Sequence, residues 1–382
     1  MKPSAAPFPD PDVLKIDRAI QKAGKHTDLL RHVTPINLEA ERRRFFASRY
    51  RHVPEFRYRP VSLDPFAFKR TLHRVAVERI EDPRVQELYA DVVQSYSDRA
   101  DLLFSVGTER FVYSSLRYFG EPSGRDVSNA EFLLHCAPVE DPEDRHTLDP
   151  PVLERLFLET SQGYGFSCPL EYSTQIIAKA LAGAKGLKIR KGVRFTQREA
   201  QALAHHEIGI HYLTTCNARL QKLRVFQSGL PVNTTTQEGM AILSEYLSGN
   251  LTLNRLREMA LRVIAISSML HGNNFPRTFQ RLVDQYHVEP QHAFDVTVRA
   301  YRGGGFTKDY VYMSGFREML QHFSAAKRMD SLLIGKTHLR YQETIEHMME
   351  LGMVTPPKYV PEAFRNPQKP HPILEYLTQS IR

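Results

Sequence analysis

The chain has little cysteine and no long hydrophobic run. Its three cysteines, Cys136, Cys168 and Cys216, lie far apart in 382 residues, which argues against a disulfide framework and against a cysteine-ligated zinc site. No stretch approaches the roughly 20 apolar residues that a membrane span needs. The proline-rich start also lacks the apolar core of a secretory signal. We therefore expect a cytoplasmic protein that does not associate with membranes.

Signatures of nucleic-acid binding are missing as well. The net charge is +8, but the basic residues are dispersed, and no zinc-finger, helix-turn-helix or aromatic-basic RNA-binding pattern accompanies them. We do not expect a nucleic-acid partner. A basic surface of this kind would equally suit an acidic peptide or a carboxylate terminus. The sequence does not indicate an oligomeric state.

The composition, 42% hydrophobic and 25% charged, is typical of a globular protein with a sizeable core. We expect an N-terminal extension with one helix over residues 1–36 and a single domain over 37–352. A Pro-rich tail with a short helix would follow over 353–382. A polar linker at 138–151 is a weak candidate for a subdivision of the domain, and no internal repeat is visible.

Hydrophobic periodicity predicts an α+β protein that is mostly α-helical. Ser173–Leu181 and Leu187–Arg190 alternate and are separated by a Gly-containing turn, which predicts a β-hairpin or small sheet. The helix at 194–213 follows directly and opens with a capping box, Thr196-x-x-Glu199. The other predicted helices are 11–30, 38–50 (capped by Asn37), 83–106, 108–120, 128–136, 236–247, 252–270, 276–286, 290–301, 310–323, 329–333, 337–352 and 373–381. The segment 216–235 is expected to be a loop.

The helix at 194–213 contains His206-Glu-Ile-Gly-Ile-His211, a His-Glu-x-x-x-His pattern. Two imidazoles can hold a zinc ion while an adjacent carboxylate, Glu207, handles a proton of the attacking water. The i, i+5 spacing separates the two rings by roughly 140° on an ideal α-helix. A shared metal therefore requires a local bulge, which Gly209 would make easier. Two unrelated helix histidines remain the alternative.

A zinc peptidase site needs a third protein ligand. Glu238, at the start of the following helix, is the candidate, although Thr235-x-x-Glu238 is also a capping-box pattern, so Glu238 could merely cap its helix. Glu245 lies seven residues further along the same helix face. It could orient a ligating histidine, or it could form an ordinary ion pair.

A cluster rich in glycine and tyrosine follows at 301–315. Arg302, Lys308, Tyr310 and Tyr312 could bind a carboxylate or an oxyanion, and three successive glycines allow a close backbone approach. The alternative is a helix end followed by a turn, with the tyrosines in the core. The cluster has no nucleotide-binding spacing.

Four segments together resemble one family: His206–His211, Gly229–Pro231, Gln237–Ala241 and Gly304–Tyr312. This is the domain family of the microtubule-associated tyrosine carboxypeptidases and of bacterial proteins labelled "flavohaemoglobin expression-modulating QEGLA motif". The resemblance extends over most of residues 37–351 and includes the pattern Ser-x-x-Tyr-x-Gly-x-Pro that ends at Pro122. The usual Gln-Glu-Gly-Leu-Ala reads Gln-Glu-Gly-Met-Ala here, which keeps the carboxylate.

The resemblance implies a zincin-like metallopeptidase that binds one Zn²⁺ per chain. Its ligands would be His206, His211 and Glu238, with Glu207 as the catalytic base. We therefore expect a carboxypeptidase that removes a C-terminal residue, aromatic in the eukaryotic members, from a peptide or protein tail. On this hypothesis Tyr310 or Tyr312 donates to the oxyanion, and Arg302 or Lys308 binds the terminal carboxylate. The rival hypothesis is a non-catalytic or regulatory protein that keeps the zinc site as structure.

Overall fold

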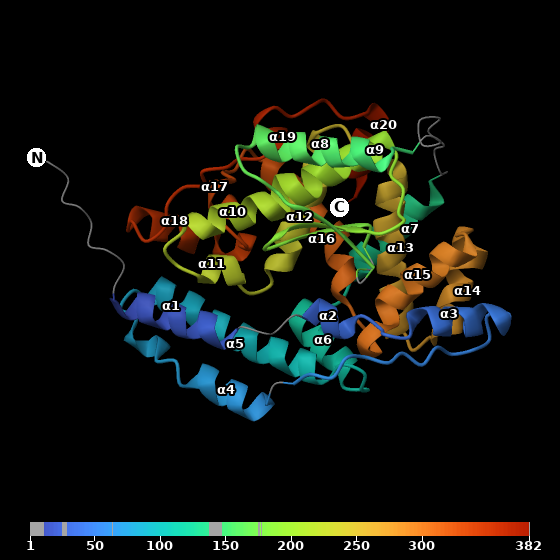
Figure 1. Ribbon diagram of the computed structural model, residues 1–382, viewed down its shortest axis with the longest axis horizontal. Coiled ribbons are helices and arrows are strands. Elements are labelled where there is room, and N and C mark those ends of the chain that lie inside the picture. Colours follow the sequence, from blue (N-terminus) through green and yellow to red (C-terminus); the bar gives the residue numbers. More distant parts are fainter. Residues whose placement is uncertain are drawn as a thin grey trace, which may run out of the picture.

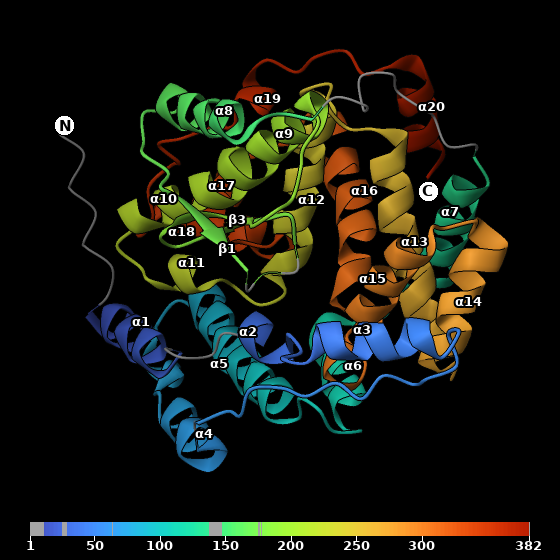
Figure 2. The same ribbon diagram turned by 45° about the vertical axis from the view of Figure 1, so that its right-hand side comes forward.

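The computed structural model describes residues 11–24, 29–62, 64–136, 147–174, 176 and 178–381. The chain is mostly helical, with one three-stranded sheet near its middle (Figures 1 and 2). The first helices are α1 (Pro11–Ala23), α2 (Leu29–Val33), α3 (Leu38–Ala47), α4 (Pro65–His73), α5 (Pro83–Phe104), α6 (Phe111–Phe119), α7 (Gly124–His135) and α8 (Pro150–Gly163). None of the described helices is long and apolar enough to cross a membrane.

The middle of the chain forms the sheet and a long continuous helical segment, part of which is a π-helix. Its elements are β1 (Leu170–Ser173), β2 (Ala180–Gly183), β3 (Gly186–Arg190), α9 (Gln197–Leu203), the π-helix η3 (Ala204–Tyr212), α10 (Leu213–Leu220), α11 (Val225–Ser228) and α12 (Asn233–Leu247). The C-terminal helices are α13 (Leu253–Leu270), α14 (Phe275–Tyr286), α15 (Pro290–Tyr301), α16 (Val311–Ser324), α17 (Asp330–Leu333), α18 (Gln342–Glu350), α19 (Glu362–Arg365) and α20 (Pro372–Ser380). Short 3₁₀ turns are η1 (Val77–Arg79), η4 (Arg302–Gly304), η5 (Lys308–Tyr310) and η6 (Leu339–Tyr341).

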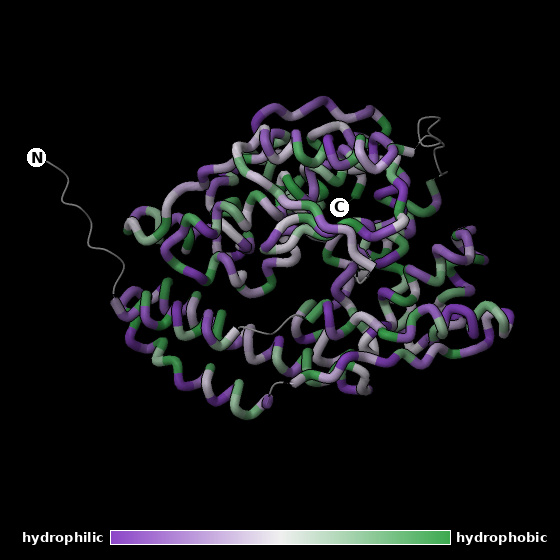
Figure 3. The backbone as a smooth tube through the Cα atoms, viewed as in Figure 1, coloured by the Kyte–Doolittle hydropathy of each residue, from purple (hydrophilic) through white to green (hydrophobic). Residues whose placement is uncertain are grey.

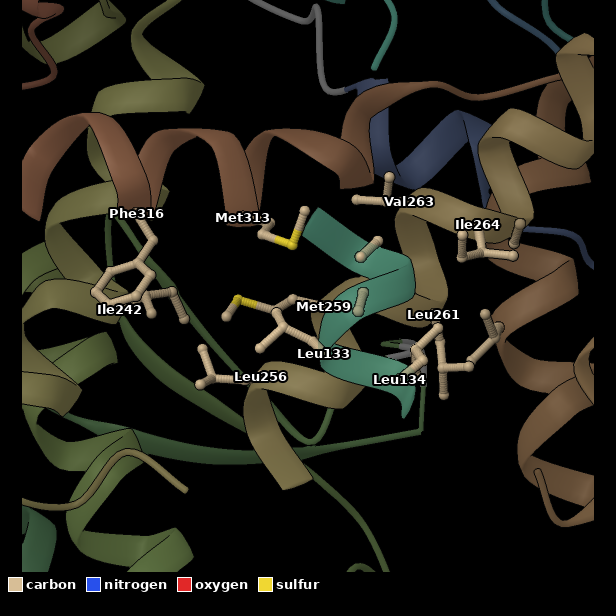
Figure 4. Close-up of a cluster of buried hydrophobic side chains, with 14 of the residues drawn as sticks. Leu133, Leu134, Ile242, Leu256, Met259, Leu261, Val263, Ile264, Met313 and Phe316 are labelled. Carbon is tan, nitrogen blue, oxygen red and sulfur yellow. The ribbon is translucent and has the colours of Figure 1, made fainter. Parts of the chain in front are cut away.

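The largest hydrophobic core lies between α7, α12, α13 and α16. Helix α13 is buried almost all round, as expected for a helix whose apolar residues are not confined to one face. Its Met259 lies near Met313 of α16, and Val263 and Phe316 belong to the same cluster (Figure 4). The hydropathy-coloured tube likewise shows apolar residues gathered where helices face one another (Figure 3).

A smaller core joins the sheet to the π-helix. Leu187 and Ile189 of β3 pack with Ala204 and Ile208 of η3 and with Phe157 of α8. The sheet therefore lies directly against the segment that carries the two motif histidines.

The predicted hairpin is correct for β2 and β3, which pair antiparallel. The single strand predicted over Ser173–Leu181 is wrong. The chain instead forms β1, which ends at Ser173 and pairs parallel to β3, and then β2, which gives the order β1-β3-β2. A parallel partner depends on contacts that period-2 alternation does not encode.

Most predicted helices are present, including α5, which begins at Pro83 with Asp82 as its cap. Helix α8 was not foreseen. The loop expected at 216–235 was wrong, because the segment contains the end of α10, all of α11 and the start of α12. Asn37 occupies the N-cap position of α3 as predicted, but its side chain forms no capping hydrogen bond. The side chain of Asn37 instead bonds with Glu55 and Arg57 of the following extended segment.

The predicted division into an extension, a domain and a tail stays a prediction. Part of the proposed subdivision at 138–151 lies outside the described residues. In the tail, Ala363, Leu377 and Ile381 belong to the same core as α12 and α13. The helix of the predicted extension packs through Val13, Ile16 and other residues against α5.

Helices α12 and α16 approach most closely at a pair of glycines. A methyl group at Gly239 would overlap the carbonyl of Gly315, and one at Gly315 would overlap the carbonyl of Thr235. Side chains at either position would push the helices apart. The glycines thus permit the contact that fixes α12 against the C-terminal helices.

We expect Gly239→Ala to destabilise the protein by about 3 kcal/mol, because overpacking against rigid backbone cannot be relieved by a side-chain movement. Gly163→Ala in α8 is the matched control, since a methyl there meets no atom within 4 Å. Urea unfolding of both variants measures the effect. Equal stability of the two variants would contradict this account of the glycine pair.

A second prediction concerns pH. His338 precedes η6, and its Nδ1 accepts a hydrogen bond of 3.0 Å from the Arg340 backbone N–H. Burial and the charge of Arg340 lower the pKa of His338 to about 4 from its ordinary 6.5. The unfolded state therefore binds the proton first, and stability is lost as the pH falls from 6.5 through 4.

We expect His338→Asn to lose less stability than the wild type between pH 7 and pH 5, because asparagine offers a capping acceptor that does not titrate. Urea midpoints at the two pH values measure this difference. Identical pH dependence in both proteins would show that His338 is not involved.

Candidate metal centre

The two motif histidines face each other because the helix between them is a π-helix. Thr196 and Glu199 form both halves of the predicted capping box at the start of α9, and the chain passes through η3 into α10 without a break. In η3 the backbone bonds run between residues five apart, so positions i and i+5 share a face. The ring centroids of His206 and His211 are 4.9 Å apart, and their Nε2 atoms are 3.3 Å apart. The expected local distortion is thus present.

Gly209, the residue expected to ease this distortion, lies in the middle of the π-helix. A methyl group there would sit 3.2 Å from the Tyr164 hydroxyl. That hydroxyl accepts a hydrogen bond from the backbone N–H of Glu362. The glycine therefore leaves room for the Tyr164 hydroxyl, which connects the end of α8 to the C-terminal segment.

Helix α12 brings Glu238 to the histidines. Its Oε2 is 3.4 Å from Nε2 of His211 and 3.7 Å from Nε2 of His206. The helix begins at Asn233, with Val232 in a left-handed conformation before it, and no side-chain cap forms. Thr235 is therefore already inside the helix. The alternative that Glu238 only completes a capping box is wrong.

The other residues of Gln237–Ala241 hold α12 in this place. The side chain of Gln237 accepts from the Thr214 hydroxyl of α10 at 3.0 Å and donates to the Gly335 carbonyl at 3.2 Å. Gly239 allows the approach of α16, and Met240 and Ala241 belong to the main core. Each position of the motif therefore has a physical role in setting α12 beside the π-helix.

His206, His211 and Glu238 could together hold a metal ion. In the described part of the chain they are the one group of three or more His, Cys, Asp or Glu residues whose potential ligand atoms all lie within 4.8 Å of one another. Two imidazole nitrogens and a carboxylate oxygen are a donor set that suits zinc. Three protein ligands rather than four leave a position for water or substrate, the pattern of catalytic sites.

Buried charge around the histidines favours a cation between them. Burial alone would lower the pKa of His206, but hydrogen bonds with Glu238 and Glu245 outweigh it and raise the pKa to about 9. Burial would raise the pKa of Glu238, yet the charge of Lys308 and the two histidines hold it well below its ordinary value. The carboxylates of the site are thus ionised and stabilise positive charge at the imidazoles.

Glu207 connects the π-helix to the sheet. Its Oε2 accepts a hydrogen bond of 2.6 Å from the Ala182 backbone N–H of β2. Its Oε1 is 4.0 Å from Nε2 of His206. The carboxylate therefore lies beside the three-residue cluster while the edge strand β2 fixes its orientation.

Of the downstream residues, Lys308 reaches the cluster, and Tyr312 lies next to Lys308. Lys308 Nζ is 3.0 Å from Glu238 Oε1 and 3.4 Å from the Tyr312 hydroxyl. It also lies 4.8 Å from the centre of the Tyr312 ring. Lys308 is thus ion-paired with a potential metal ligand, an arrangement that sequence reasoning did not foresee.

Arg302 and Tyr310 have other partners. The Tyr310 hydroxyl donates to the Phe119 carbonyl at 2.6 Å. The Arg302 side chain is 6% exposed, stacks on Phe306 and lies 3.9 Å from Asp309. Burial of this degree leaves Arg302 little access to a substrate. These contacts do not support Tyr310 as an oxyanion donor or Arg302 as a ligand of the substrate carboxylate.

The three glycines after Arg302 are explained by packing. Side chains at Gly303 and Gly304 would overlap Phe111 and the backbone of Thr108, and Gly305 lies against Val112. All three have positive φ, which glycine adopts without strain. The close approach that the sequence indicated is therefore to α6.

Comparison with known proteins adds independent information. The family model described as microtubule-associated tyrosine carboxypeptidase (MATCAP) matches residues 43–382. "Microtubule-associated tyrosine carboxypeptidase 1" of Mus musculus is 24% identical over 326 residues, which cover 82% of this chain and 61% of the relative. "Putative tyrosine carboxypeptidase MATCAP2" of Mus musculus is 24% identical over 380 residues, covering 89% and 64%.

The human "Microtubule-associated tyrosine carboxypeptidase 1" is 22% identical over 362 residues, 90% of this chain and 66% of the relative. The chain thus spans less than two thirds of the length of these curated relatives. The family model nevertheless covers nearly all of the chain, including the π-helix, α12 and the segment around Lys308. The chain therefore belongs to the microtubule-associated tyrosine carboxypeptidase family.

Proposed function

We propose that the chain is a zinc-dependent carboxypeptidase with a zincin-like site, which removes a C-terminal residue from a peptide or protein tail. The observation that carries this proposal is the cluster of His206, His211 and Glu238 with the Glu207 carboxylate beside it. The relatives named tyrosine carboxypeptidases support an exopeptidase that accepts a C-terminal tyrosine.

Zinc bound by the three side chains would polarise the scissile carbonyl and make water more acidic. Glu207 would accept the proton of the attacking water and hold it for the leaving amine. The hydrogen bond from the Ala182 N–H to Oε2 orients the Glu207 carboxylate. Oε1 has no backbone partner among the described contacts. Both the position of Glu207 and its chemistry support the proposal that it is the base.

Strand β2 offers a means of holding an extended peptide. It is an edge strand of the β1-β3-β2 sheet, and its Ala182 N–H is used by Glu207 rather than by β3. A substrate backbone could add to this edge in the manner of β-augmentation. The peptide would then run past the Glu207 carboxylate.

Tyr312 stays the proposed donor to the developing oxyanion, since its hydroxyl lies on the Glu238 side of the cluster next to Lys308. We assign Lys308 to holding Glu238, because an ammonium that is already ion-paired has less to offer a substrate carboxylate. With Oε1 bound to Lys308, Glu238 would present Oε2 to the metal.

The rival function, a structural metal site without turnover, is less well supported. Structural zinc sites are closed by four protein ligands, whereas the group in the described residues has three. His211 and Glu238 also keep 20% and 12% of their side chains exposed, so a small substrate group can approach them.

The first prediction of the proposed function concerns zinc content. The wild type should bind about one zinc per chain, and His211→Ala and Glu238→Ala should each lose it, because two remaining ligands hold zinc poorly. Elemental analysis after reconstitution and desalting measures this. His271→Ala is the control, since that histidine only bonds the Ser267 carbonyl within α13. A wild type without zinc would refute the proposal.

The second prediction separates metal binding from chemistry. Glu207→Gln should keep its zinc and lose at least about 10²-fold in turnover, since an amide cannot accept the proton. Mass spectrometry of an acidic peptide that ends in tyrosine measures loss of the terminal residue. The same peptide with an amidated end should resist the wild type. Full activity of Glu207→Gln would exclude this mechanism.

A further inference from the structure

Helix α12 contacts the two motif histidines through two glutamates. Glu238 faces Nε2 of His206 and His211, and Glu245, two turns later on the same helix, faces the opposite nitrogen of His206. The distance from Glu245 Oε1 to His206 Nδ1 is 2.7 Å. The sequence left open whether Glu245 orients a histidine or forms an ordinary ion pair.

Glu245 is itself held rigidly. Its side chain is 2% exposed, and Arg255 at the start of α13 grips it with two hydrogen bonds. Arg255 Nε donates to Oε2 and Nη2 donates to Oε1, each at 3.3 Å. A buried carboxylate needs such a partner to stay ionised. The backbone carbonyl of Glu245 also accepts from the N–H groups of Asn250 and Leu251 in the α12–α13 connection.

This arrangement determines which nitrogen of His206 carries a proton. An ionised carboxylate can only accept a hydrogen bond, so Nδ1 must be the donor. In the neutral ring, Nε2 then presents its lone pair toward His211 and Glu238. The opposite tautomer would present an N–H there and could not ligate a metal.

We propose that Glu245, anchored by Arg255, is the positioning residue that keeps His206 in the tautomer and orientation needed for metal binding. The consequence for the metal rests on the proposed zinc site, whereas the tautomer does not. Outer carboxylates of this kind change metal affinity by about 10–100-fold in other proteins. If the ion pair had only a structural role, its removal would change the stability of the fold and leave the zinc affinity unaltered.

The chain contains a matched control. Glu41 of α3 is also buried, at 2% side-chain exposure, and its Oε2 lies 2.8 Å from Nε2 of His52. It likewise has an arginine partner, Arg44, at 3.0 Å. Glu41→Gln therefore removes the same charge from a similar histidine–glutamate pair that does not touch the metal cluster.

The experiment compares Glu245→Ala, Glu245→Gln, Arg255→Met and Glu41→Gln with the wild type. Zinc affinity is measured by chelator competition, and thermal unfolding of the metal-free proteins establishes that each is folded. We expect zinc affinity to fall about 10–100-fold in Glu245→Ala and less in Glu245→Gln, whose amide oxygen can still accept from Nδ1. Glu41→Gln should bind zinc like the wild type, even if it is less stable.

A second readout needs no metal. Imidazole ¹⁵N spectra of the metal-free proteins, recorded over a pH series that extends until the His206 ring is observed in its neutral form, report which nitrogen is protonated. The wild type and Glu41→Gln should hold the Nδ1–H form of His206, and Glu245→Ala should give a mixture. If Glu245→Ala keeps the wild-type tautomer and zinc affinity, the positioning role is refuted. If the wild type binds no zinc but its tautomer depends on Glu245, only the zinc proposal falls.

Discussion

The site depends on one constraint: two imidazoles five residues apart must share a face of one helix. An α-helix turns such positions about 140° apart, and the π-helix over Ala204–Tyr212 removes this separation. A π-helix has less favourable backbone geometry, so it persists where the surroundings hold it. Here the surroundings are α12, the small sheet and α8, each of which contacts η3.

Most of the fold can be understood as support for that segment. The glycine pair at 239 and 315 lets α16 pack closely against α12. The side chain of Gln237 connects α12 to α10 through its hydrogen bond with Thr214. On the other side, β2 holds Glu207 through the Ala182 N–H. Three elements from different parts of the chain thus orient the carboxylates of the candidate site.

The charges of the site are likewise balanced by residues from other elements. Glu245 is a buried ion and Glu238 a half-buried one on the same helix, and each has one Lys or Arg partner, Arg255 and Lys308 respectively. Lys308 contacts Oε1 of Glu238, whereas Oε2 of Glu238 faces the two Nε2 atoms. Arg255 holds both oxygens of Glu245, whose Oε1 faces Nδ1 of His206. A positive ion between the imidazoles would add to the compensation of these carboxylates, whose removal from water is costly.

The sequence by itself determined the local features: the capping box at Thr196, the i, i+5 histidine spacing with its required distortion, and most helices, because these depend on nearby residues and on periodicity. It also indicated Glu238 but left a capping role open, since the pattern around Thr235 fits both. Only the tertiary structure decided that α12 starts at Asn233, that Lys308 pairs with Glu238, that Arg302 is buried, and that β1 lies parallel to β3. These facts arise from packing between residues distant in the chain, for which local patterns carry no signal.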